Sequence, residues 1–330
     1  MIRKTIENLK TAPRKIADSK SKKLHVCDVL IIGSGVTGYA AGMYSARFNL
    51  KTIIIGKEDG GTINLTDDIS NYPGFKKLTG IELSTKLKEH AMDYENITIL
   101  NGIIEKLTKT TAGFFAETST DKFQSKTVIL ATGTKAKELG IPGEKKLMGN
   151  GVHTCALCDG PFYKDKIVGV IGGSDSAAKE ALLLTQFAKK VYIIYRGDKI
   201  HPEPINENRI KANKKIETIL NTNLIKINGD KKVTSVTLDK PYKEKLDFIL
   251  DGIFIEIGHI PLSDLAKNLG AKLNKKNEVI SNRNSETNIP GFYVAGDVAD
   301  TVFKQAITGV AEGVKASFHS YEYIQNYKNK

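Results

Sequence analysis

Gly33-Ser34-Gly35-Val36-Thr37-Gly38 decides the fold of the first part of the chain. The run before it, Val26 to Ile32, is mostly apolar and rich in β-branched residues, which predicts a buried parallel strand. A helical stretch follows from Tyr39 to Asn49, and a second strand is predicted from Thr52 to Ile55. A G-x-G-x-x-G turn between a strand and a helix holds a pyrophosphate at the helix N-terminus. We therefore expect this part of the chain to bind a dinucleotide.

A second copy of this pattern occurs later in the chain. Lys166 to Ile171 predicts a strand, Gly172-Gly173-Ser174-Asp175-Ser176-Ala177 opens a helix that runs to about Phe187, and Val191 to Tyr195 predicts the next strand. Two dinucleotide folds in one chain imply two nucleotides that exchange electrons, typically a flavin and a nicotinamide. The second motif has Ser174 in place of its middle glycine. That side chain either crowds the pyrophosphate or donates a hydrogen bond to it.

Two of the three cysteines lie just before the second motif, in Cys155-Ala156-Leu157-Cys158-Asp159-Gly160. Two residues between cysteines allow a disulfide to close and reopen, which is redox chemistry. Asp159 is near enough to supply or accept a proton. Half of a zinc site has the same spacing, but the sequence has no second C-x-x-C, no nearby pair of histidines, and Cys27 is distant. A metal site is therefore not expected.

Composition limits the class of protein. The 330 residues are 40% hydrophobic and 26% charged, as in globular proteins of two domains, and the formal net charge of +12 favours acidic partners. Basic runs do not alternate with aromatic residues, so a nucleic-acid groove is not expected. Val29 to Ala46 is uncharged but rich in glycine, so we expect no membrane span. Few cysteines suggest a reducing, cytoplasmic compartment.

The remaining predicted elements surround these motifs. Strands are expected from Val128 to Thr134 and from Phe248 to Ile257, the latter ending at Gly258. A helix is expected to start at Lys304-Gln305-Ala306 and to contain Gly309 and Gly313. Glycines inside a helix weaken it, so these two indicate close packing or a ligand.

Together these features resemble low-molecular-weight thioredoxin reductases from about Asp28 to about Tyr323. The landmarks stand in the order found in that family: Gly33 to Gly38, Gly60-Gly61, Asn71 to Gly74, Ala131-Thr132-Gly133, Cys155 to Gly160, Gly172 to Ala177, Ala295 to Val298, and Gln305 to Thr308. The resemblance implies an α/β fold of two Rossmann-like dinucleotide-binding domains, the second inserted into the first. The implied segments are a basic arm at 1–24, an FAD domain at 25–135 and 261–330, and an NAD(P)H-like domain with the cysteines at 136–260.

The resemblance also implies a homodimer, a thioredoxin-like partner and an inserted domain that swivels between two poses. Cys158 would receive electrons from the flavin, Cys155 would attack the partner's disulfide, and Asp159 would protonate the departing thiolate. The implied FAD-binding residues are Gly33, Ser34, Gly35, Thr37, Gly38, Gly60, Gly61, Thr62, Asn71, Thr132, Gly133, Gly296, Asp297, Lys304, Gln305 and Ala306. The implied nicotinamide-nucleotide residues are Gly172, Gly173, Ser174, Asp175, Ser176 and Arg196. Cys27 is interpreted as a small buried strand residue.

The nicotinamide site departs from the family pattern. The family binds the 2′-phosphate of NADPH with H-R-R-x-x-x-R, whereas Tyr195 to His201 here retains only Arg196 of the three arginines. Three alternatives therefore stay open. The chain is a thioredoxin reductase that uses NADH, or uses NADPH poorly; or its donor is a ferredoxin-type carrier; or it is a flavin dithiol oxidase that passes electrons to oxygen.

Overall fold

The strand before the first glycine motif, β1 (Lys23–Ile32), lies inside the first sheet of the computed structural model, which describes residues 22–66 and 69–328. Its successive side chains enter different cores. Val29 and Ile31 pack in one apolar cluster, and Leu30 and Ile32 pack in another on the opposite face of the sheet. Burial on both faces explains why the last four residues of this strand, 29–32, are all apolar.

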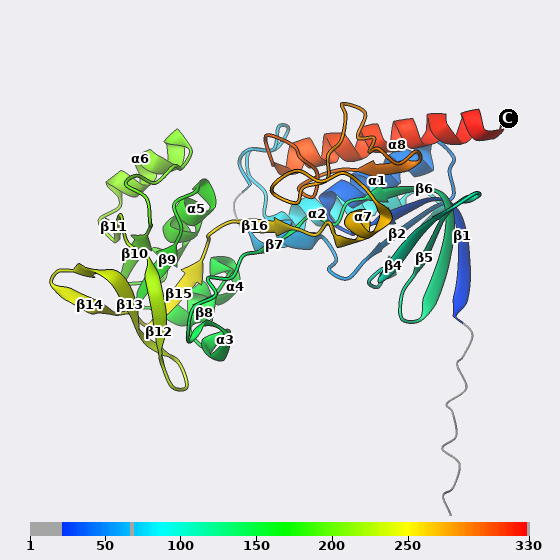
Figure 1. The fold of residues 1–330 in the computed structure, drawn as a ribbon. Helices are drawn as coiled ribbons and strands as arrows, with labels where there is room; N and C mark the ends of the chain where they lie inside the picture. The colour runs from blue at the N-terminus through cyan, green and yellow to red at the C-terminus, as the bar shows by residue number, and fades with distance from the viewer. Residues whose placement is uncertain (1–21, 67–68, 329–330) are drawn as a thin grey trace, which may run out of the picture.

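The first sheet has seven strands, and β1 pairs in parallel with both of its neighbours. The strand order is β3-β2-β1-β6-β5-β4, with β17 also paired to β6. The other strands are β2 (Thr52–Gly56), β3 (Ile97–Asn101), β4 (Lys106–Thr110), β5 (Gly113–Glu117), β6 (Asp121–Leu130) and β17 (Phe292–Val294). Because β17 comes from near the C-terminus, the first lobe is built from both ends of the chain (Figure 1).

Helices cover this sheet, among them α1 (Val36–Arg47) and α8 (Ala306–Lys328), which pack against each other. The remaining helical segments of the lobe are η1 (Gly61–Leu65), α2 (Gly80–Met92) and α7 (Asp264–Leu269). The expected close packing at Gly309 and Gly313 is confirmed. A Cβ atom built on Gly313 would lie 2.6 Å from the Thr37 carbonyl oxygen, and one on Gly309 would lie 2.6 Å from Thr37 Oγ1.

The second lobe contains a five-stranded parallel sheet in the order β11-β10-β9-β15-β8. Its strands are β8 (Val152–His153), β9 (Ile167–Ile171), β10 (Lys190–Ile194), β11 (Ile216–Ile219) and β15 (Gly252–Ile255). An antiparallel sheet of β12 (Leu224–Gly229), β13 (Val233–Tyr242) and β14 (Lys245–Ile249) adjoins it. The helical segments are α3 (Glu144–Leu147), α4 (Ala156–Asp159), η2 (Gly160–Tyr163), α5 (Asp175–Leu184) and α6 (Pro204–Ala212).

Two short antiparallel strands link the lobes, β7 (Thr134–Ala136) on the way out and β16 (His259–Pro261) on the return. Figure 1 shows this pair crossing the narrow waist between the lobes. The lobes therefore share only a two-stranded connection in the backbone, which leaves each with its own sheets and cores.

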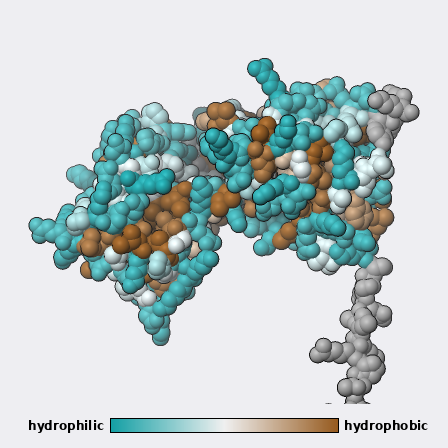
Figure 2. Space-filling view, in the orientation of Figure 1, coloured by the Kyte–Doolittle hydropathy of each residue, from teal (hydrophilic) through white to brown (hydrophobic). Residues whose placement is uncertain are grey.

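The predicted strand from Phe248 to Ile257 is wrong. The structure has two strands there, β14 in the antiparallel sheet and β15 in the parallel sheet. The chain changes sheets at Leu250 and Asp251, and the Asp251 carboxylate accepts a hydrogen bond of 2.8 Å from the Ile167 amide. Ile249 is exposed, so the apolar run from Phe248 to Ile257 does not mark one buried element. Figure 2 shows apolar side chains on the surface of this part of the second lobe.

Other boundaries shift by smaller amounts. β6 ends at Leu130, so the small residues of the predicted strand up to Thr134 lie outside it. β1 begins at Lys23, and nearly all of the predicted arm at 1–24 lies outside the described residues. Within residues 22–66 and 69–328, no helix has both the length and the apolar content to cross a membrane.

Candidate active site

Cys155 and Cys158 form a disulfide at the start of α4. Cys155 is the N-cap residue, and its sulfur accepts a hydrogen bond of 3.1 Å from the Cys158 amide. Cys155 is buried whereas Cys158 is exposed. The two sulfurs therefore differ in their access to other molecules in this arrangement of the lobes.

The turn from Cys155 to Cys158, here named the redox turn, lies against the first lobe. Cys155 Sγ is 4.0 Å from the Leu65 carbonyl oxygen at the end of η1, the segment that begins at Gly61. On its other side, the Ala156 amide donates a hydrogen bond of 2.8 Å to the Glu180 carboxylate of α5. The turn is thus held between α5 and the predicted flavin domain.

Asp159 makes a contact that the sequence did not predict. Its Oδ2 lies 2.9 Å from Nδ1 of His153, a buried residue on β8. His153 Nε2 lies 2.7 Å from the hydroxyl group of Tyr163, which is also buried. Burial raises the pKa of Tyr163 to about 12, and the charges of Asp159 and Asp251 add to this effect. The nearness of His153 to the motif in sequence was the available signal, but sequence alone does not show that its ring points toward Asp159.

The N-terminus of α1 is free to receive an anion. Gly35 is its N-cap residue without a side-chain cap, and the first turn contains no acid. Gly33 has φ of +123°, and a Cβ atom there would lie 2.1 Å from the Ala131 carbonyl oxygen, so only glycine fits. Gly35 pairs with Gly60 of the next loop. Open helix amides between bare glycines fit the pyrophosphate of FAD.

Three side chains that the sequence did not single out support this loop. The hydroxyl group of buried Tyr39 donates to the Asp59 carboxylate and accepts a hydrogen bond of 3.3 Å from the Gly60 amide. Lys88 of α2 forms an ion pair with the same carboxylate. These contacts fix Gly60 beside Gly35. The loop at Gly60 and the N-terminus of α1 together form a cradle for FAD.

A third part of the cradle follows β17. Burial raises the pKa of Asp297, and the charges of Lys304 and His259 counter this effect only in part. Its carboxylate accepts no hydrogen bond within the described part of the chain, so it fits the hydroxyl groups of a ribityl chain. Asn71 Nδ2 donates a hydrogen bond of 3.0 Å to Gln305 Oε1, which brings two distant predicted flavin contacts together. The residues present therefore fit FAD.

Several predicted flavin residues make protein contacts instead. The Ser34 hydroxyl donates to the Glu58 carbonyl at 2.9 Å, and the Thr132 hydroxyl donates to the Leu262 carbonyl at 2.8 Å. Thr37 is enclosed by α8. The Lys304 ammonium group donates to the Asp297 and Ala299 carbonyl oxygens and pairs with a carboxylate of Glu278 at 2.7 Å. These side chains support the cradle through contacts within the protein.

The second glycine motif differs from the first because its own residues satisfy the helix. Ser174 is the N-cap residue of α5, and its hydroxyl group accepts from the Ala177 amide at 3.5 Å. Asp175 adds an acid to the first turn. Burial raises the pKa of Asp175, but hydrogen bonds from Asn206 and the Glu203 amide and the contact with Lys179 together bring it below its usual value. An ionised acid at this position repels phosphate.

An aromatic ring also lies over this motif. A Cβ atom on either Gly173 or Gly197 would lie 2.6 Å from atoms of the Tyr195 ring. The His201 amide donates a hydrogen bond of 2.6 Å to the Gly173 carbonyl, which brings the loop after Tyr195 against the motif. Arg196 and Ser176, two predicted nucleotide contacts, are exposed.

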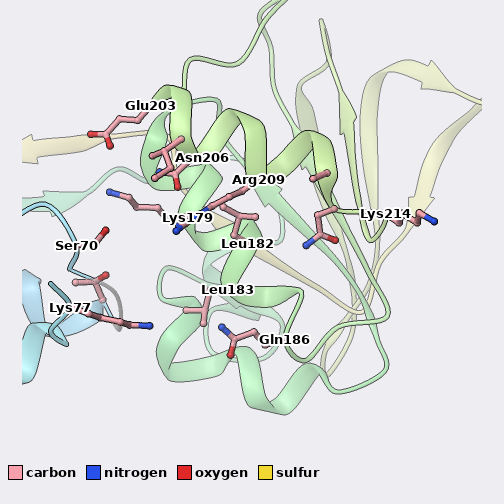
Figure 3. Close-up of a pocket in the computed structure, with 14 residues that line it drawn as sticks. Ser70, Lys77, Lys179, Leu182, Leu183, Gln186, Glu203, Asn206, Arg209 and Lys214 are labelled. Atoms are coloured by element: carbon pink, nitrogen blue, oxygen red, sulfur yellow. The ribbon is translucent and has the colours of Figure 1, made fainter.

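A cavity of about 640 Å³ lies apart from both motifs, between α5, α6 and the segment around Ser70 and Lys77 of the first lobe (Figure 3). Its basic lining residues are Lys77, Lys179, Arg209 and Lys214. None of the residues predicted to bind a nucleotide lines it. It is a cleft between the lobes whose lining contains several basic side chains.

Comparison with known proteins gives one family. The model of the pyridine nucleotide-disulphide oxidoreductase family matches residues 27–313. A thioredoxin reductase of Mycolicibacterium smegmatis is 38% identical over 314 residues, which cover 93% of this chain and 98% of that protein. The structure of a thioredoxin reductase of Lactococcus lactis matches with a TM-score of 0.87 at 35% identity, covering 91% of this chain and 99% of the other. A ferredoxin-flavin thioredoxin reductase of Clostridium acetobutylicum matches with a TM-score of 0.50 at 31% identity, covering 92% and 99%.

Proposed function

Because the chain belongs to the pyridine nucleotide-disulphide oxidoreductase family, as one of its low-molecular-weight thioredoxin reductases, we propose a specific electron route for it. The enzyme uses FAD and reduces the disulfide of a thioredoxin-like protein. The single observation behind the choice of donor is the self-capped second glycine motif.

The first lobe would hold FAD. The N-terminus of α1 would bind its pyrophosphate, Asp297 would accept hydrogen bonds from its ribityl hydroxyl groups, and Asn71 and Gln305 would contact its ring system. FAD, when bound, stores two electrons and passes them to a disulfide. The protein contributes the uncapped amides of α1, the backbone of Gly60 and the acceptor Asp297.

The cysteines then act in order. The Cys155 thiolate attacks the partner's disulfide, which forms a mixed disulfide and releases one partner sulfur as a thiolate. The Cys158 thiolate attacks Cys155 Sγ, which re-forms the internal disulfide and releases the second partner sulfur. Asp159 gives a proton to a departing thiolate. Two electrons thus pass to the partner, and its disulfide becomes a dithiol.

This order requires the second lobe to move. Cys155, the attacking residue, is buried against Leu65, so no partner protein reaches it in the present arrangement. We place the domain boundaries at 25–135 and 261–330 for the first domain and 136–260 for the second, with the paired β7 and β16 as the hinge. The two structural matches above cover similar shares of the chain with TM-scores of 0.87 and 0.50, which supports different placements of the lobes.

The donor we propose is a reduced electron-carrier protein of the ferredoxin type. The Ser174 cap and the Asp175 carboxylate lie at the N-terminus of α5, and the Tyr195 ring lies against Gly173, which disfavours a dinucleotide at the second motif. The similarity to a ferredoxin-flavin thioredoxin reductase supports the same choice of donor. A net charge of +12 suits an acidic carrier.

Anaerobic stopped-flow reduction, followed at the flavin absorbance, tests the donor. We expect slow bleaching by NADH and NADPH and rapid bleaching by reduced ferredoxin. Rapid bleaching of the flavin by NADH or by NADPH would overturn the choice of donor. Reduction of a thioredoxin disulfide by dithionite-reduced enzyme, measured separately, tests the disulfide reductase activity without any natural donor.

We also propose that the chain forms a homodimer in a cytoplasmic, reducing compartment. The first lobe exposes apolar side chains at Ile81, Val302 and Phe303, which a subunit contact would cover. Light scattering during gel filtration measures the mass. A mass of one chain at working concentration would contradict the dimer.

A further inference from the structure

The proton supply of the redox turn extends beyond Asp159. Asp159 Oδ2, both ring nitrogens of His153 and the Tyr163 hydroxyl form a continuous series of contacts of 2.9 and 2.7 Å. His153 is 6% exposed and lies on β8, two residues before Cys155. A buried ring with a partner at each nitrogen has a fixed orientation and is available for proton exchange with those partners.

The surroundings leave His153 few other partners. Its ring stacks on Phe254 of β15, with centroids 5.3 Å apart, and meets the edge of the Tyr163 ring at 5.4 Å. The charged group that faces it is Asp159. Asp251, just before β15, contributes to the raised pKa of Tyr163. Glu180 of α5 accepts a hydrogen bond from the Ala156 amide at the start of α4. The His153 ring therefore lies in an apolar environment, with a carboxylate at one ring nitrogen and a hydroxyl group at the other.

We propose that His153 is a positioning residue that orients Asp159 and restores its proton during reduction of the partner's disulfide. The inference rests on the proposed function, since it needs Asp159 to act as the acid of the redox turn. It assigns to His153 and Tyr163 roles that the cysteine motif alone does not contain.

When the partner's second sulfur leaves as a thiolate, the Nδ1–H bond of the His153 imidazolium breaks, Asp159 relays the proton, and an S–H bond forms. The neutral ring keeps its Nε2 proton toward the Tyr163 oxygen. Uptake of one proton from water by the ring restores the starting state. No electron passes through His153.

His153→Asn tests the inference because its amide still donates a hydrogen bond but does not titrate. The rate of thioredoxin disulfide reduction by dithionite-reduced enzyme is measured in single turnovers from about pH 5 to pH 9. In the wild type, the rate rises as the cysteine ionises and falls as the His153–Asp159 pair loses its proton. We expect His153→Asn to remove the falling limb and to slow the reaction about tenfold near neutral pH.

Two further variants separate proton supply from folding. In an Asp159→Asn background, His153→Asn is expected to cause no additional loss, because the two residues act in one path. His25→Asn is the matched control, since His25 also contacts a carboxylate, that of Asp121, at 2.9 Å in the first lobe. It is expected to leave the pH profile unchanged. Retained flavin absorbance shows that each variant is folded.

An unchanged pH profile in His153→Asn, or losses that add up in the double variant, would overturn the inference. Failure of the wild type to reduce the disulfide would instead overturn the proposed function. The two failures are distinguishable because the second appears in the wild type before any substitution at His153.

Discussion

Cys155 and Cys158 are three residues apart, yet they are exposed to different degrees. The proposed order of attack makes their serine variants behave differently. Cys158→Ser is expected to accumulate a mixed disulfide with thioredoxin, since the serine cannot release the partner from Cys155. Cys155→Ser is expected to accumulate none. Each variant should lose activity at least about a hundredfold, and non-reducing electrophoresis with mass spectrometry identifies the adduct.

Cys27 is the control for these variants. It is buried in β1, as predicted, and burial raises its pKa to about 12, so its thiol is inert near neutral pH. Cys27→Ala should reduce thioredoxin at the wild-type rate. An adduct that depends on Cys27 would contradict the assignment of Cys155.

Glu256 follows β15 directly and lies beside the second motif, where a Cβ atom on Gly172 would lie 2.1 Å from its carbonyl oxygen. Burial raises the pKa of its carboxyl group to about 7. A raised carboxyl pKa means that the folded state holds a proton that the unfolded state has lost, so stability falls as the pH rises from 4.5 to about 7. Glu256→Gln should therefore gain stability with rising pH, by on the order of 3 kcal/mol above pH 7.

Thermal unfolding across this pH range checks the prediction for Glu256. Glu89→Gln, at an exposed position on α2, serves as its control and should show no such trend. A gain in Glu256→Gln that is equal at pH 5 and pH 8 would show that burial of the charge is not the cause.

At the scale of elements, α8 and α1 touch through Gly309 and Gly313. Alanine is a better helix former than glycine by about 1 kcal/mol, but overpacking costs about 1 to 3 kcal/mol. At Gly313 the obstacle is the backbone carbonyl of Thr37, which cannot move aside, whereas at Gly309 it is the Thr37 side chain, which can rotate. Gly313→Ala should therefore destabilise the protein more than Gly309→Ala. Urea unfolding of both variants measures the difference, and equal or reversed losses would contradict this account.

The elements that could be predicted from the sequence are those whose pattern depends on local burial. β1, β2, β9 and β10 are apolar runs because parallel strands are covered on both faces. β14 and β15 could not be separated in advance, since Asp251 changes the direction of the chain through a contact with Ile167, which is distant in sequence. The pairing of His153 with Asp159 was missed for a related reason: sequence distance does not give side-chain direction.

The two nucleotide sites show the same limit at larger scale. Both glycine motifs were predicted from sequence, and the departures at Ser174 and in the stretch from Tyr195 to His201 were visible there. Their consequence was not, because it depends on the Tyr195 ring lying over Gly173. A motif predicts a backbone turn, whereas the space left for a ligand depends on the side chains that pack around it.

For the whole molecule, a narrow waist joins the two lobes, and the face seen in Figure 2 is mostly hydrophilic, with an apolar patch on the second lobe. The net charge of +12 acts on partners before contact, so association with an acidic electron carrier should depend on salt. The Debye length falls from about 30 Å at 0.01 M salt to about 8 Å at 0.15 M. The second-order rate of flavin reduction by ferredoxin should fall about tenfold or more over this range.

Reduction of the same flavin by dithiothreitol, a neutral dithiol, provides the comparison. It uses the Cys155–Cys158 disulfide but involves no charged partner, so its rate should change little over the same range of salt. If both reactions slow equally, salt acts on the enzyme itself, for example on the movement of the lobes about β7 and β16. If only the ferredoxin reaction slows, the charge of the whole molecule attracts the carrier, and substitutions that remove lysines from the first lobe should lower that rate in proportion to the charge removed.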